Sequence, residues 1–138
     1  MPKDKAAKPE KGQVPIRWAA DVADHDYAAA HAYLSLKLTP AATDEVVTRL
    51  RKAKLRTRRA NDILRASGLT PAPLDDPGVV SDLVKVIEGK ALSPVLVVGG
   101  AEGTDIADGF HRVSLVYRID PFGEIPLKLA DADGRAGG

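Results

Sequence analysis

The sequence predicts a single α+β domain: a small mixed sheet packed by helices, with a helical extension on its N-terminal side. The chain has 138 residues, which is the size of one compact domain. Apolar residues recur at steps of three and four in the first half, as they do in amphipathic helices. Short apolar runs rich in β-branched residues, which are typical of strands, occur in the second half.

The two ends of the chain are poor in apolar residues and show no periodicity. Such segments cannot bury enough surface to offset the entropy of ordering them. We therefore expect disordered tails over residues 1–17 and 131–138. Between them, we expect a helical extension over residues 18–57 and the main domain over residues 58–130.

Two helices are expected in the extension. Asp24 and Asp26 are candidate N-caps of the first, whose apolar stripe contains Tyr27, Ala30, His31, Leu34 and Leu38. Thr39-Pro40 ends that helix. Thr43 opens the second helix, with an inner face of Val46, Val47, Leu50 and Ala53. From the spacing alone, the second helix either continues to Gly68 or breaks near Leu55 into a short strand and turn.

The second half predicts a helix, a hairpin, a helix and a last strand. Asp76 caps a helix with Pro77 at its first position, with Val80, Leu83, Val84 and Ile87 as its buried face and Gly89 at its end. Val95–Val98 and Asp105–Ala107 form a hairpin around a loop over Gly99–Thr104. Phe110–Ile119 is a helix with Phe110, Val113, Val116 and Tyr117 inward, and Ile125–Leu129 is the last strand.

The most informative stretch is Ile106–Arg112, where Asp108-Gly109-Phe110-His111-Arg112 joins a strand to a helix. The first amides of a helix lack partners within the helix, and the positive end of its dipole attracts anions. Because His111 and Arg112 can add side-chain donors, this turn is suited to a phosphate group. A purely structural alternative stays open, in which Asp108 caps the helix, His111 satisfies a carbonyl and Arg112 pairs with an acid.

Four motifs of the sequence resemble, in order and spacing, the ParB/sulfiredoxin-like domain. They are Asp76-Pro77-Gly78-Val79 to Leu83, Ser93-Pro94 to Val98, Gly109-Phe110-His111-Arg112 and Ile125-Pro126-Leu127-Lys128-Leu129. The match covers about residues 58–130, and bacterial proteins with an I-A-D-G-Y-H-R turn look similar. In those two families the turn holds phosphates of CTP or ATP. The resemblance implies the same for Gly109, His111 and Arg112, and places Arg65 near an arginine that approaches the phosphates. It also favours an edge strand around Arg56–Ala60 and a turn over Asn61–Gly68.

The departures from that family bear on activity. Phe110 stands where sulfiredoxin has its catalytic cysteine, and the chain contains no cysteine, which excludes sulfinic acid reduction, disulfides and thiolate metal sites. Val79, Asp82 and Val86 replace three further nucleotide contacts of the family. ParB's DNA-reading helix-turn-helix has no counterpart. Hydrolysis or phosphoryl transfer would need a base and usually Mg²⁺ held by carboxylates such as Asp108, Glu102 or Asp105, so whether the protein is an enzyme stays open.

The segment from Arg49 to Arg65 is strongly basic, with eight Lys and Arg residues and one acid, a net charge of +7. It is either a solvated face or a contact for nucleic acid through Arg56, Arg58 and Arg59. Only 4% of residues are aromatic, which disfavours stacking of single-stranded bases.

The leading hypothesis is therefore binding of a phosphate-bearing small molecule, such as a nucleotide with Mg²⁺, through Asp108, Gly109, Phe110, His111, Arg112 and Arg65. The alternatives are a nucleic-acid-associated protein and an interaction module without a ligand. The acids around His25 and His31 are interpreted as helix first-turn residues, so no resident metal is expected. No apolar run has the length of a membrane span and the N-terminus lacks an apolar signal region, so a cytoplasmic location is expected; the oligomeric state is left open.

Overall fold

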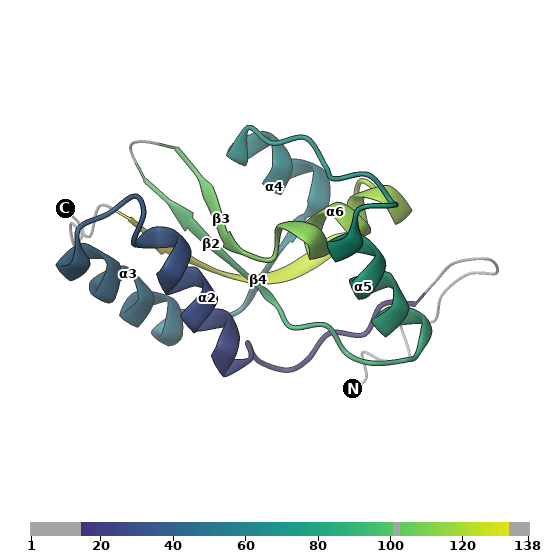
Figure 1. Cartoon of the computed structure of the whole chain (residues 1–138), viewed down its shortest axis with the longest axis horizontal. Coiled ribbons are helices and arrows are strands. Elements are labelled where there is room, and N and C mark those ends of the chain that lie inside the picture. The colour runs from purple at the N-terminus through teal and green to yellow at the C-terminus, as the bar shows by residue number, and fades with distance from the viewer. Residues whose placement is uncertain (1–14, 101–102, 133–138) are drawn as a thin grey trace.

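The computed structural model describes residues 15–100 and 103–132, and it confirms a mixed α+β architecture. The sheet contains β1 (Arg56–Arg59), β2 (Val95–Gly99), β3 (Asp105–Asp108) and β4 (Glu124–Asp131) in the order β1-β4-β2-β3. Helices α2 (Asp24–Leu34) and α3 (Pro40–Lys52) cover one face. Helices α4 (Ala60–Ser67) and α6 (Phe110–Ile119) lie on the other, and α5 (Pro77–Ile87) packs beside α6 (Figure 1).

The strand pairing is mixed. β2 and β3 form the predicted antiparallel hairpin, and β1 pairs antiparallel with β4. β2 and β4 are parallel neighbours, with Val97 opposite Leu129. The helix α6 therefore joins β3 to β4 across the intervening strand β2. This connection places the start of α6 at the end of β3, beside the start of α2.

The two N-terminal helices are an integral layer of the core. α2 and α3 pack on the sheet face that carries Leu96, Val98 and Ala130. The buried residues of α3 are Thr43, Val46, Val47 and Leu50, which include three of the predicted apolar positions. The fourth, Ala53, is the C-cap of the helix and is only partly buried. The expected boundary between residues 57 and 58 falls inside β1, because this edge strand completes the sheet that both parts cover.

Helices α4 and α6 bury the opposite sheet face. Their buried side chains meet Val95, Val97, Ile106, Ile125 and Leu127. Helix α5 extends this layer, because its Val79 and Val86 pack with Leu92 and with Leu115 of α6. α6 has the predicted bounds. Its Val113 and Val116 are buried as expected, with Phe110 and Tyr117 partly buried.

The caps of the first two helices differ from prediction. α2 begins after Ala23, and neither Asp24 nor Asp26 caps it, because both lie inside its first turn. It ends at Leu34, four residues before the expected end. The predicted stop signal Thr39-Pro40 instead starts α3, since the Thr39 hydroxyl accepts a hydrogen bond from the Ala42 amide.

Residues 60–67 form a helix, so the turn expected over Asn61–Gly68 is wrong. Ile63 and Leu64 are buried against the sheet, and this burial stabilises a short α4. Gly68 closes it in the left-handed conformation at φ 67°. The predicted edge strand is confirmed as β1, although Ala60 already belongs to α4.

Helix α5 is capped by the Asp76 carboxylate as predicted, which accepts from the Gly78 and Val79 amides. Its buried face is different, because apolar residues occupy both sides of the helix. Val79 and Val86 are buried against α6, and Leu83 is partly buried. The predicted inner residues Val80, Val84 and Ile87 are exposed.

The described ends of the chain extend beyond the expected folded region. Ile16 and Trp18 pack against the core, and the Leu92 amide donates to the Arg17 carbonyl over 2.8 Å. At the other end, β4 runs to Asp131 and the Ala132 amide donates to the Gly99 carbonyl. Packing of Ile16 and backbone pairing of Arg17 and Asp131 thus order residues that were expected to lie in the tails. Residues 1–14 and 133–138 of the expected tails lie outside the described residues.

Candidate functional site

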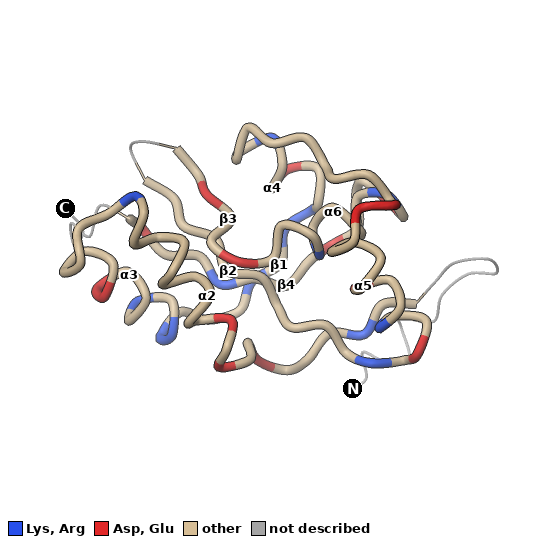
Figure 2. The backbone as a smooth tube through the Cα atoms, in the orientation of Figure 1, with Lys and Arg blue, Asp and Glu red and all other residues tan. Residues whose placement is uncertain are grey.

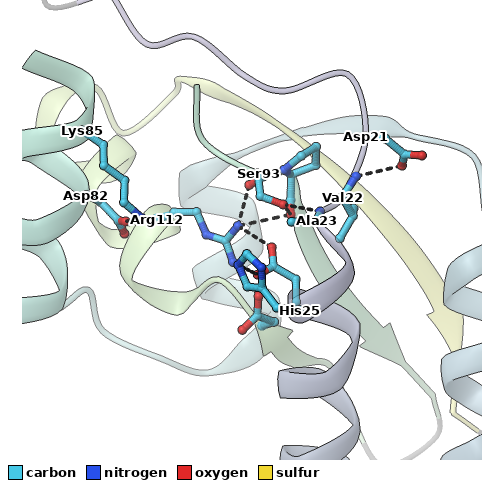
Figure 3. Close-up of polar contacts among 11 residues, drawn as sticks. Asp21, Val22, Ala23, His25, Asp82, Lys85, Ser93 and Arg112 are labelled. Atoms are coloured by element: carbon cyan, nitrogen blue, oxygen red, sulfur yellow. Dashed lines mark hydrogen bonds and ion pairs between the residues drawn. The ribbon is translucent and has the colours of Figure 1, made fainter. Parts of the chain in front are cut away.

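A pocket of about 470 Å³ opens between the starts of α2 and α6 and one side of α5. This volume lies within the range typical of small-molecule sites. Figure 3 shows Arg112 between Asp82 and Lys85 on α5 and the Ala23–His25 segment at the start of α2. The functional groups that line it are Asp21, His25, Asp26, Ser81, Asp82, Lys85, Ser93, Asp108, His111 and Arg112.

The turn that begins α6 depends on Gly109. This residue has φ 115°, a conformation that side chains rarely adopt, and an added Cβ would lie 2.8 Å from a Val95 methyl group. Gly109 is the N-cap of α6 and offers no side-chain acceptor. The first backbone amides of α6 therefore lie at the pocket and have no side-chain cap, whereas the first amides of α5 donate to the Asp76 carboxylate.

Helix α2 also starts at this pocket without a side-chain cap, since its N-cap residue is Ala23. The positive ends of two helix dipoles thus lie along one pocket. Asp24 and Asp26 in the first turn of α2 offset much of this potential. No acid lies in the first turn of α6, so its start is the better place for an anionic group.

Arg112 is held by protein groups. Its Nη1 donates to Asp26 Oδ2 over 3.1 Å and to the Ser93 carbonyl over 2.6 Å, and its Nη2 donates to Asp108 Oδ2 over 2.6 Å. The side chain is only 11% exposed. This arrangement is the structural alternative for Arg112, in which it pairs with acids, and it ties α6 to α2, β3 and the segment before β2.

The carboxylates around Arg112 are themselves desolvated. Burial raises the pKa of Asp108, although the Arg112 charge opposes this, and Asp26 adds repulsion that raises it further. Asp26 is buried and also lies 3.3 Å from His25 Nε2. Asp108 does not cap α6, because its carboxylate is bound to Arg112.

His111 stands at the mouth of the pocket, with its side chain 49% exposed. Its Nε2 lies 3.3 Å from Asp76 Oδ2, and its ring meets Phe110 edge-on at 5.6 Å between centroids. It packs so closely on the start of α5 that a Cβ at Gly78 would lie 2.6 Å from the imidazole. The contact with the Asp76 carboxylate and the packing on Gly78 fix the position of the ring.

Helix α5 contributes a stripe of residues to the pocket that is not among the predicted site residues. Gly78, Ser81, Asp82 and Lys85 line the pocket, and their spacing of three, one and three residues places them on one helix side. Asp82 is 13% exposed and lies 3.9 Å from Lys85 Nζ. Burial raises its pKa, against the opposing charges of Arg112 and Lys85. The helical spacing of Ser81, Asp82 and Lys85 was the sequence signal that could have identified this side of the pocket.

Other predicted residues lie elsewhere. Arg65 is on α4, where its exposed side chain pairs with Asp62 at 3.5 Å, and it does not line the pocket. Asp105 binds Lys37 and the Tyr33 hydroxyl on α2 and its C-terminal turn. Glu102 lies outside the described residues. Arg56, Arg58 and Arg59 lie on the exposed edge strand β1.

The two histidines of α2 contact different acids and do not form one site. His31 pairs with Asp44 at 2.8 Å, while His25 faces Asp26 at the pocket. Across residues 15–100 and 103–132, no three His, Asp or Glu side chains form a group that could hold a metal ion. Among the same residues, no helix has the length and apolar character needed to cross a membrane.

Comparison of the chain with protein-family models, with curated proteins and with solved structures finds no match. The resemblance to the ParB/sulfiredoxin-like domain therefore stays a prediction based on the motifs.

Proposed function

We propose that the protein binds a small phosphate-bearing molecule in the pocket between α2, α5 and α6. The observation that carries this proposal is the open start of α6, where uncapped amides and the half-exposed His111 imidazole lie at one mouth of the pocket. Backbone amides at a helix start and an adjacent imidazole are suitable donors for phosphate oxygens. Arg112 acts as a positioning residue that fixes this turn.

The charge balance of the pocket narrows the ligand class. Its lining has four carboxylates (Asp21, Asp26, Asp82, Asp108) against the two permanent cations Lys85 and Arg112. An isolated anion would therefore meet a net negative surface beyond the α6 turn. The proposed ligand carries its own hydrogen-bond donors or a bound cation, as the hydroxyl and amino groups of a nucleotide or a Mg²⁺–nucleotide complex do.

The motif resemblance supports the same proposal, because ParB and sulfiredoxin hold nucleotide phosphates at the turn that corresponds to Gly109–Arg112. The present geometry differs in detail, since Arg112 is occupied by protein oxygens and Arg65 is not in the pocket lining. The proposal is therefore restricted to binding and assigns no reaction.

The proposal is tested by thermal unfolding with phosphate, ATP, ADP and CTP, each with and without Mg²⁺. A ligand at 100 times its Kd stabilises the folded state by about 2.7 kcal/mol. His111→Ala should abolish the response. His31→Ala is the matched control, because His31 is half-exposed and pairs with Asp44 away from the pocket. An unchanged melting temperature with every ligand, or equal responses of the two variants, would contradict the proposal.

A further inference from the structure

The basic edge of the sheet borders a second, apolar groove. Arg56 and Arg58 of β1 are exposed and lie opposite Leu127 and Ile125 of β4. They therefore share the sheet face that α4 covers in part. Figure 2 shows Lys and Arg gathered along this part of the backbone.

The groove lies between α4 and the sheet and has a volume of about 220 Å³. Ile63, Ala66, Val97, Leu127 and Leu129 provide an aliphatic lining, and Leu129 is 40% exposed. The volume is below the usual range for small-molecule pockets. It suits one large apolar side chain that anchors a peptide.

The rim of the groove carries more positive than negative charge that is free to bind a partner. Arg58 lines the groove, and its Nη1 donates only to the neighbouring Thr57 carbonyl among the contacts of the described residues. Asp62, the one acid in the lining, is paired with Arg65. Arg56 has no acid partner within the described residues. The rim therefore complements a carboxylate placed beside the anchoring side chain.

We propose that this groove binds an acidic segment of a partner protein, with an apolar side chain between α4 and β4 and carboxylates on Arg56 and Arg58. A second copy of the chain is disfavoured, since a symmetric contact would bring the arginines of both copies together. The N-terminal segment 1–14 does not complement the rim either, because it holds four lysines against two acids.

A peptide fits this surface better than a nucleic acid does. Phosphates would pair with the arginines, but the groove holds no aromatic side chain on which a base could stack. A polynucleotide would leave the aliphatic lining uncovered. The proposed interaction is independent of the small-molecule pocket, which lies at the starts of α2 and α6.

The test uses a fluorescein-labelled peptide, Glu-Glu-Leu-Phe-Glu-Glu, in anisotropy titrations of the full chain. Replacing Leu-Phe by Ser-Ser should weaken binding at least tenfold, as should Arg58→Glu. Lys90→Glu, which makes the same charge change just beyond the end of α5, should alter the affinity less than twofold. Ala66→Trp, which fills the groove from the exposed side of α4, should also weaken binding at least tenfold.

Three results would overturn the proposal. The first is a Ser-Ser peptide that binds as tightly as the Leu-Phe peptide. The second is an equal effect of Arg58→Glu and Lys90→Glu on the affinity. The third is a hexanucleotide of single-stranded DNA that binds more tightly than the peptide. Backbone amide shifts in an NMR titration separate local binding from misfolding of a variant. The peptide should shift the signals of Arg58, Ala66 and Leu129 in the unmodified chain, and shifts confined to other residues would equally exclude this groove.

Discussion

Replacing Arg112 by alanine should cause a large loss of stability, because it removes the cation shared by two desolvated carboxylates. Asp26 and Asp108 bind the guanidinium over 3.1 and 2.6 Å, and all three side chains are 20% exposed or less. Breaking a buried ion pair by removing one partner typically costs about 3–5 kcal/mol. For a chain of this size, at roughly 4 °C per kcal/mol, the melting temperature should fall by about 12–20 °C.

The assay is urea and thermal unfolding at pH 7 and at pH 4, with Arg65→Ala as the control. Arg65 makes an exposed ion pair, so its removal should cost less than about 1 kcal/mol. The cost of Arg112→Ala should shrink at pH 4, because burial raises the pKa of Asp108 and this carboxylate then takes up a proton and loses its charge. Adding Asp108→Asn to Arg112→Ala should recover part of the loss. The reasoning is refuted if Arg112→Ala costs no more than Arg65→Ala at pH 7.

Three further substitutions test other parts of the structure. Gly109→Ala should destabilise the protein by about 1–3 kcal/mol, because the added Cβ would lie 2.8 Å from Val95. Gly103 has a similar φ but open space around it, so Gly103→Ala should cost clearly less. Equal losses of unfolding free energy in denaturant titrations would contradict this. Burial raises the pKa of Asp82, so its ionised form destabilises the folded state above that pKa, and this destabilisation disappears as the pH falls below the pKa of the unfolded state. Asp82→Asn should therefore stabilise the protein at pH 7, with a gain in unfolding free energy that fades towards pH 3. A gain independent of pH would exclude this cause. Lys128 is 5% exposed and donates to the Tyr27 hydroxyl and a backbone carbonyl, so Lys128→Ala should cost about 1–3 kcal/mol in calorimetric melts, and a smaller effect than that of an exposed lysine would show that these bonds contribute little.

Local sequence signals predicted the hairpin and the helix that follows it. The β-branched, apolar run Val95–Val98 favours a buried strand. The positive φ at Gly109 favours glycine whatever residues surround it. Asp76-Pro77 likewise contains both parts of a helix start, and the structure confirms the cap. These features depend on residues close to one another in the chain.

The partners of Arg112 could not be predicted in this way. Asp26 lies 86 residues earlier, and its meeting with Arg112 depends on α2 packing beside β3. The buried side of α5 was ambiguous for a related reason: its apolar residues occupy two sides, and only the position of α6 selects Val79 over Val80. The sequence identified the turn that opens the pocket but not the carboxylates that surround it.

The central claim is that a phosphate-bearing ligand binds at the start of α6, and an NMR titration of the ¹⁵N-labelled chain tests it most directly. With CTP or ATP, each with Mg²⁺, the account predicts saturable shifts of the Phe110 and His111 amides, together with residues of α5 that line the pocket such as Ser81. Absence of any saturable shift there, or shifts centred on β1 and α4 instead, would contradict it.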